Sequence, residues 1–185
     1  MKLIAFNKPC GVICQFSAHD THRSLKDFIP VPRVYPAGRL DTDSEGLLLL
    51  TDNGALQARI AQPRHQTVKT YWAQLEGTPC PDKLKLLQQK MDLGDFVAKP
   101  AQIRLLDNGE TAKLWARVPP VRFRKNVPDF WLEIRIGEGK NRQVRRMTAK
   151  AGYPCLRLVR VAVGRINLFD LQLGLGEWRR INRLP

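Results

Sequence analysis

The sequence predicts an α+β fold in which strands dominate. Residues 47–50 form a run of four leucines, which is typical of a buried strand, and residues 69–75 (KTYWAQL) are rich in β-branched and aromatic side chains. Residues 156–163 (LRLVRVAV) alternate apolar and basic side chains, as a half-buried strand does. We therefore expect a mixed, largely antiparallel sheet with flanking helices and a central cleft.

Local signals place the elements along the chain. A turn over residues 7–11, from which Lys8 projects, separates two short strands, and a capping box from Ser24 to Asp27 opens a short helix. Gly152 and Pro154 end a helix whose buried face carries Val144 and Met147. The expected strands are 3–6, 12–16, 47–50, 69–75, 101–106, 114–118, 131–136 and 156–163, and the other expected helices are 55–61 and 83–90.

Length and composition favour a single domain over residues 1–185. A chain of 185 residues with 43% hydrophobic side chains is long enough for one well-buried core. It contains no apolar run near the roughly 20 residues that span a membrane, and its start lacks the features of a signal peptide. Four cysteines stand without CxxC spacing. We expect a cytoplasmic protein with reduced thiols and no membrane partner.

The charge balance predicts a polyanionic partner. The chain has 31 Lys and Arg against 17 Asp and Glu, a formal net charge of +14. The excess is greatest from Lys140 onward, where arginine dominates and suits bidentate contacts to phosphate. A proline-rich loop over residues 119–128 carries three more basic side chains, Arg122, Arg124 and Lys125. A solvated basic face that only aids solubility is the alternative interpretation.

An acidic cluster lies directly before the leucine run. Asp41, Asp43 and Glu45 alternate along residues 38–54 (GRLDTDSEGLLLLTDNG) and would share one face if that segment were extended. The spacing resembles a calcium loop, but prolines and glycines precede it where a helix should enter, and leucines occupy the liganding second half. His19, His22 and His65 have no companion zinc motif. We therefore expect no metal site.

One acid and one arginine offer a better chemical interpretation. A carboxylate beside a guanidinium in a partly dry pocket can act as a nucleophile or a general base. Arg39 is two residues from Asp41 and could share its face, whereas Arg142 or Arg145 could approach from the distant basic helix. A purely structural role for Asp41, as the cap of a turn, is the alternative.

In order along the chain, the segments GRLDTDSEGLLLLTDNG, KTY and EGKNRQVRRM resemble the signature series of the RNA pseudouridine synthases of the RsuA and RluA superfamily. Asn7-Lys8-Pro9-Cys10-Gly11 resembles the first motif of that family, and residues 156–181 resemble its closing leucine-arginine segment. The resemblance covers nearly the whole chain. One departure is Thr51-Asp-Asn-Gly54 in place of Thr-Asn-Asp-Gly. Because the first motif begins at Asn7, we also expect no S4-type RNA-binding domain, which many relatives carry before this motif.

The resemblance implies a pseudouridine synthase fold and an isomerase that detaches a uracil, turns it and rejoins it to the same ribose through C5. It implies Asp41 as the catalytic aspartate, Tyr71 as the aromatic residue that packs on the uracil, and Arg145 as the arginine that pairs with the aspartate. It further implies that substrate RNA contacts six residues, namely Lys8, Arg39, Lys69, Arg142, Arg146 and Leu158. No cofactor is implied, and the expected partner of the monomeric enzyme is 23S ribosomal RNA of the large subunit.

Two other classes of protein remain as alternatives. A non-catalytic RNA-binding or ribosome-assembly protein would explain the charge, but not the joint presence of the acid, the tyrosine and the arginine. A metal-dependent nuclease would use Asp41, Asp43 and Glu45 as ligands and would need a divalent cation.

Overall fold

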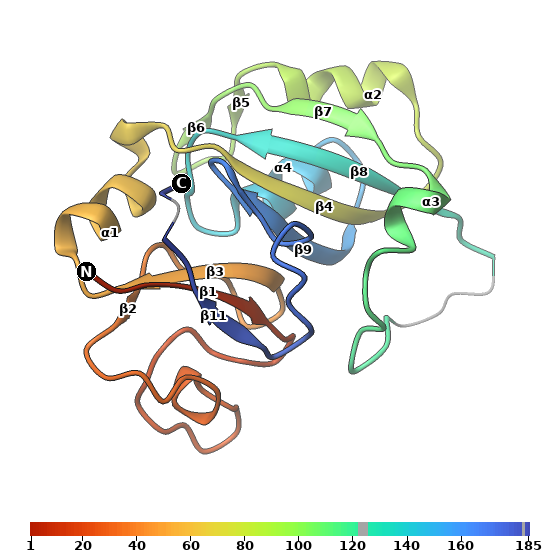
Figure 1. The fold of residues 1–185 in the computed structure, drawn as a ribbon. Helices are drawn as coiled ribbons and strands as arrows, with labels where there is room; N and C mark the ends of the chain where they lie inside the picture. Colours follow the sequence, from red (N-terminus) through yellow and green to blue (C-terminus); the bar gives the residue numbers. More distant parts are fainter. Residues whose placement is uncertain (122–125, 183) are drawn as a thin grey trace.

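The computed structural model describes residues 1–121, 126–182 and 184–185. Within these residues the strands form a nine-stranded sheet and a separate two-stranded hairpin (Figure 1). The strands are β1 (Leu3–Lys8), β2 (Tyr35–Pro36), β3 (Glu45–Thr51), β4 (Lys69–Glu76), β5 (Met91–Asp92), β6 (Val97–Ala98), β7 (Gln102–Leu105), β8 (Asp129–Ile136), β9 (Cys155–Val163), β10 (Ile166–Asn167) and β11 (Trp178–Arg180).

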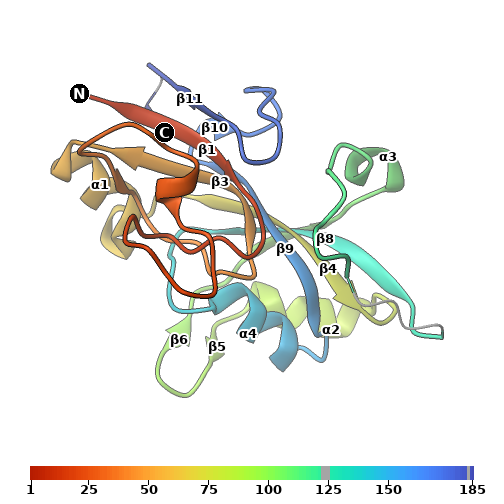
Figure 2. The ribbon, with the colours of Figure 1, turned by 90° about the horizontal axis from the view of Figure 1, so that it is seen from below.

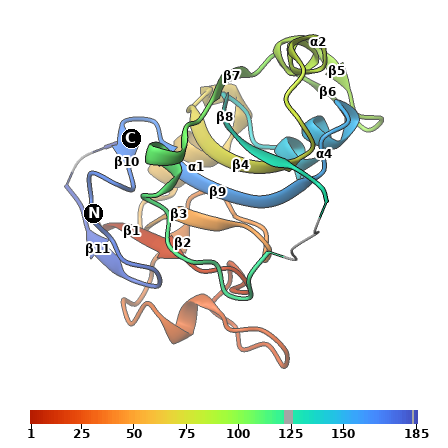
Figure 3. The same cartoon turned by 90° about the vertical axis from the view of Figure 1, so that its right-hand side faces the viewer.

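The large sheet has the order β11-β1-β3-β9-β4-β8-β7, with β2 beside β3 and β10 beside β9. Its described pairings are antiparallel, except that β3 and β9 run parallel. Figure 3 shows β9 between β3 and β4, where it joins the two halves of the sheet. The predicted α+β fold with a mixed, largely antiparallel sheet is confirmed.

The helices are short. The α-helices are α1 (Gly54–Ala61), α2 (Pro81–Lys85), α3 (Asn108–Thr111) and α4 (Gln143–Lys150), and the 3-10 turns are η1 (Leu25–Asp27), η2 (Pro63–His65) and η3 (Leu86–Gln88). Figure 2 shows α2 and α4 below the strands β9, β4 and β8. Val144 and Met147 of α4 are buried in the main core, as the helical spacing predicts.

The leucine run is buried on both faces of the sheet. Leu48 and Leu50 belong to the main core, whereas Leu47 and Leu49 pack in a second cluster with Leu56 of α1. Every residue of β3 is buried, so the strand is held along its whole length. This places the acidic segment before β3 at a rigid point of the sheet.

Three predicted elements differ from the structure. Residues 12–16 do not form a strand and have only an isolated bridge from Ile13 to Ser24. Their backbone hydrogen bonds are made with the loop around Arg23 instead of with a strand. Residues 114–118 are not a strand, because Trp115 and Arg117 turn their side chains toward a buried carboxylate instead. The helix predicted over 83–90 is shorter, since α2 passes into the turn η3.

Gly46 is required where β3 meets β9. Its φ is +99°, and a Cβ there would lie 2.4 Å from the backbone oxygen of Arg160. We expect Gly46→Ala to lower the free energy of unfolding by about 2–4 kcal/mol, because the new methyl group adds backbone strain and a clash that only strand separation relieves. Chemical denaturation measures the change.

The matched control is Gly54→Ala at the start of α1. Gly54 has open space around its Cβ position and no positive φ, so alanine there should leave stability unchanged or raise it slightly. Equal stability of the two variants would contradict the close approach of β3 and β9.

Candidate active site

A pocket of about 460 Å³ opens where the two halves of the sheet meet. Its walls come from the loop before β3, from β4, from the start of α4 and from β9. The predicted site residues among its lining are Arg39, Asp41, Lys69, Tyr71, Arg142 and Leu158. A second hollow of about 410 Å³ shares Arg39, Asp41 and Arg142 with the first, so Asp41 lies where the two join.

Asp41 stands at the start of a tight turn. The Ser44 amide donates to the backbone oxygen of Asp41 at 3.1 Å, and the Gly11 amide donates to that of Thr42 at 2.7 Å. Residues 41–45 therefore do not meet the condition under which the three acids would share one face, because these backbone hydrogen bonds turn the chain before β3 begins. Asp41 and Asp43 remain partly exposed, whereas Glu45 is buried within β3.

Arg142 connects the acidic turn to α4. Its guanidinium lies 3.5 Å from the Asp41 carboxylate and forms a two-pronged contact with Asp43 at 3.1 and 2.9 Å. Arg142 adopts a left-handed backbone conformation with φ 47° directly before α4, which directs the chain toward the turn. Burial alone would raise the pKa of Asp43, but the hydrogen bond from Arg142 and the charge of Arg145 hold that pKa below its ordinary value.

Arg145 contacts the same turn through Asp43. It donates to the backbone oxygens of Asp43 at 3.0 Å and Cys155 at 3.1 Å, and its ion pair within the described residues is with the Asp43 carboxylate at 3.4 Å. The expected pairing of Arg145 with Asp41 is thus corrected: Arg142, one turn earlier, reaches Asp41 instead. Arg145 fixes the position of the turn that carries Asp41.

Tyr71 and Leu158 form the apolar wall of the pocket. Tyr71 lies in the middle of β4 between Ile134 of β8 and Arg160 of β9, and its side chain is buried in the main core while it lines the pocket. Leu158 of β9 is also buried and lines the same pocket. An aromatic face next to an aliphatic side chain suits a flat heterocycle such as a nucleobase.

Two predicted RNA contacts lie elsewhere. Lys8 is fully buried at the end of β1, where its ammonium donates to the backbone oxygens of Pro9 at 2.9 Å and Val12 at 2.7 Å. The expectation that Lys8 projects toward RNA is wrong, because these carbonyls draw its side chain inward, and burial lowers its pKa to about 8. Arg146 does not line the pocket; it pairs with Asp95 on the β5–β6 hairpin.

The basic segment from Lys140 is less exposed than its composition indicates. Arg157 and Arg160 are buried within β9, whereas Arg165, Arg179 and Arg180 are exposed. The basic residues Arg122, Arg124, Lys125 and Arg183 lie outside the described residues.

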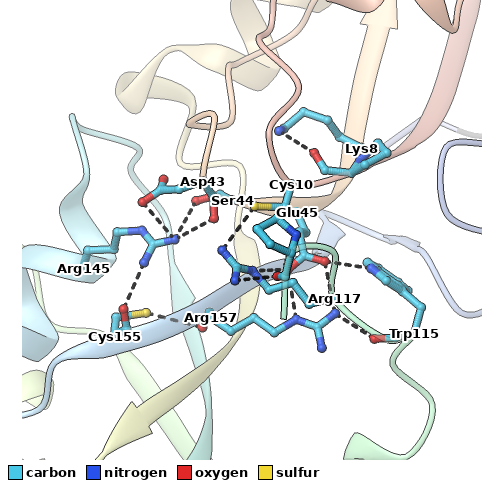
Figure 4. Close-up of polar contacts among 12 residues, drawn as sticks. Lys8, Cys10, Asp43, Ser44, Glu45, Trp115, Arg117, Arg145, Cys155 and Arg157 are labelled. Carbon is cyan, nitrogen blue, oxygen red and sulfur yellow. Dashed lines mark hydrogen bonds and ion pairs between the residues drawn. The ribbon is translucent and has the colours of Figure 1, made fainter. Parts of the chain in front are cut away.

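Sequence reasoning missed a buried charge network behind the turn. Glu45 accepts from Arg157 at 2.9 and 3.1 Å and from the Trp115 indole at 2.8 Å, with Arg117 at 3.6 Å (Figure 4). Glu45 is the first residue of a strand whose apolar sequence predicts burial, and a buried glutamate needs a buried cationic partner. This requirement was the signal in the sequence that could have revealed the network. The network anchors the first residue of β3, directly after the turn of Asp41.

The cation-loop and nuclease alternatives are not supported by this geometry. Glu45 belongs to the buried network and does not join Asp41 and Asp43, whose carboxylates face arginines. No cluster of three His, Cys, Asp or Glu suited to a metal ion occurs in the described part of the chain. Within the same residues, no helix has the length and apolarity needed to cross a membrane.

The pocket brings together a carboxylate, its paired guanidinium and a buried aromatic side chain, a combination that suits chemistry on a nucleobase. Residues 2–150 match the family described as RNA pseudouridylate synthase, and the chain belongs to this family. It is therefore an enzyme that isomerises uridine in RNA to pseudouridine, and the motifs in its sequence are of the RsuA type.

Curated relatives are similar over nearly the whole chain. A protein of Xanthomonas campestris pv. campestris named ribosomal large subunit pseudouridine synthase E is 54% identical over 96% of this chain and 94% of its own length. The protein of the same name from Vibrio vulnificus is 50% identical over 98% of this chain and 75% of its own length. A crystal structure of a pseudouridylate synthase superposes with a TM-score of 0.79 at 29% identity and covers 98% of this chain and 70% of its own.

Proposed function

We propose that this enzyme converts a uridine of 23S ribosomal RNA to pseudouridine, with Asp41 as the catalytic carboxylate. The convergence of Asp41, Tyr71 and Arg142 on one pocket carries the proposal, because these residues come from three distant parts of the chain. The names of the similar proteins from Xanthomonas and Vibrio support the large ribosomal subunit as the source of the substrate.

Each residue has a distinct part in the proposed reaction. The target uridine leaves the base stack and its ring rests against Tyr71, since chemistry on a base requires access to its edge and face. Asp41 acts on the nucleotide as the bond from C1′ to N1 breaks. The ring then turns, C5 bonds to C1′, the C5 proton leaves and N1 takes up a proton. In this proposal, Tyr71 also assists the loss of the C5 proton.

The two arginines act on the carboxylate rather than on the base. Arg142 contacts Asp41 directly and so orients the reacting oxygen, whereas Arg145 positions the turn through Asp43 and Ser44. Arg39 lines both hollows next to Asp41, where it can contact the phosphates that flank the target nucleotide.

The proposal includes a single catalytic domain that acts as a monomer in the cytoplasm without a metal or cofactor. Tritium release tests the reaction: the purified protein is incubated with 23S ribosomal RNA labelled with tritium at uridine C5, in the presence of EDTA. We expect release of tritium into water and a pseudouridine at one position of the RNA.

Other outcomes would contradict the proposal. Binding of RNA without tritium release from any ribosomal RNA would favour a binding module. Strand cleavage that returns when magnesium is added would favour a nuclease.

A further inference from the structure

Two buried cations that line the pocket each carry a nitrogen atom without a hydrogen-bond partner in the described residues. The Lys69 ammonium and the Nη2 atom of Arg160 are buried and form no hydrogen bond within the described residues. Lys69 is 4% exposed and Arg160 is 3% exposed. Burying a charged group without a hydrogen-bond partner costs free energy. Such a group in a pocket therefore points to a ligand that supplies the missing partner.

These two cations flank the aromatic wall. Lys69 precedes Tyr71 by two residues on β4, so their side chains lie on the same face of the sheet. Arg160 lies directly opposite Tyr71 on β9, and all three residues line the same pocket. Arg160 is held in place by hydrogen bonds from its Nε to the Leu47 oxygen at 2.8 Å and from its Nη1 to the Arg39 oxygen at 3.5 Å, whereas its Nη2 has no hydrogen-bond partner in the described residues.

Lys69 and Arg160 together place uncompensated positive charge in the lining of the pocket. Burial, and then the neighbouring charge of Arg160, lower the pKa of Lys69 to about 8. Neither cation forms an ion pair with a carboxylate within the described residues, while Asp41 pairs with Arg142 at the pocket mouth. Among the residues that line the pocket, Asp41 thus has a counter-ion, whereas Lys69 and Arg160 have none within the described residues.

We propose that Lys69 and Arg160 form a subsite that holds the detached uracil as an anion through its carbonyl oxygens. This inference rests on the proposed function. When the bond from C1′ to N1 breaks, the electron pair stays on the ring and spreads from N1 onto O2 and O4. The two cations donate N–H groups to those oxygens until C5 bonds to C1′ and the charge is lost. Fixed donors aimed at developing charge favour the transition state over the bound substrate.

The depth of the subsite favours the base over a phosphate. Phosphates stay at the surface of a bound RNA strand, whereas a flipped base is the part that enters a pocket. Lys69 and Arg160 line the same pocket as Tyr71, and in this proposal they contact the edges of a base that is stacked on the Tyr71 ring. A phosphate contact would instead suit Arg39, which also lines the second hollow.

The test compares Lys69→Met with the wild-type enzyme. We expect the single-turnover rate of pseudouridine formation to fall by about 10²-fold, with RNA affinity within about threefold and an unchanged salt dependence of binding. The melting temperature should rise, because methionine removes a buried charge that has no partner in the free enzyme. Lys69→Arg, which keeps the charge, should be faster than Lys69→Gln.

Lys8→Met is the matched control for stability. Lys8 is also buried and its pKa is also lowered to about 8, but its ammonium donates to two backbone oxygens. Methionine at this position leaves both backbone oxygens without a donor, so the melting temperature of Lys8→Met should fall. A melting temperature that rises in Lys69→Met and falls in Lys8→Met would show that Lys69, unlike Lys8, does not stabilise the free enzyme and is available to bind a ligand.

Three outcomes would overturn the inference. An unchanged rate in Lys69→Met would make Lys69 structural, and a weaker affinity with a smaller salt slope at an unchanged rate would identify a phosphate contact. Equal rates for Lys69→Arg and Lys69→Gln would exclude a need for charge. An inactive wild-type enzyme would instead refute the proposed function, and that result is distinct from all three.

Discussion

Asp41→Asn should abolish pseudouridine formation while leaving RNA binding intact. We expect the rate to fall by at least about 10³-fold, because the amide can serve neither as a nucleophile nor as a base. Asp41 is partly exposed and its ion pair with Arg142 is long at 3.5 Å, so the substitution should not disturb the fold. RNA affinity should stay within about threefold, since phosphate contacts set most of it. Tritium release and filter binding measure the two effects.

Asp43→Asn is the matched control. Asp43 lies two residues away in the same turn and has the closer contacts with Arg142 and Arg145. Its loss should loosen the turn and slow the reaction by about tenfold, because Asp41 keeps its carboxylate but is held less firmly. Equal rates for the two variants would show that the turn as a whole, rather than Asp41, carries the chemistry.

Glu45→Gln should have the largest effect on stability. Glu45 is 1% exposed and receives both prongs of the Arg157 guanidinium and the Trp115 indole. A neutral amide leaves the buried Arg157 charge without its counter-ion, and we expect the free energy of unfolding to fall by about 3–5 kcal/mol. Urea denaturation followed by circular dichroism measures this loss.

An exposed carboxylate provides the comparison for Glu45. Glu110 makes a similar two-pronged contact with Arg104, but at the surface, so Glu110→Gln should leave the melting temperature nearly unchanged. A stability of Glu45→Gln close to that of wild type would mean that the network behind β3 does not anchor the acidic turn.

Much of the fold was predictable because the signals for it are local. The leucine run, the alternation in residues 156–163 and the helical spacing after Gln143 each reflect one element and the face it buries. The predictions of secondary structure were wrong where contacts of a side chain determine the path of the backbone. Trp115 and Arg117 turn toward Glu45, so their β-favouring segment does not pair as a strand.

The candidate site was predictable as a set of residues but not as a set of contacts. Asp41, Tyr71 and the two arginines stand in recognisable motifs, and the structure brings Asp41, Tyr71 and Arg142 to one pocket. Which arginine reaches Asp41 depends on the left-handed residue before α4, a feature that no local pattern marked. The register between β4 and β9 likewise decides that Arg160 faces Tyr71.

By itself, the sequence determined the family and the main strands and singled out Asp41 as the candidate acid, because these follow from short motifs and from periodicity. Only the tertiary structure decided which charges are satisfied. Lys8 and Lys69 are both lysines in motifs of the same family, yet the Lys8 ammonium donates to two carbonyl oxygens, whereas the Lys69 ammonium has no hydrogen-bond partner within the described residues. Burial and partners depend on contacts between distant residues, and the packing of the sheet sets those contacts.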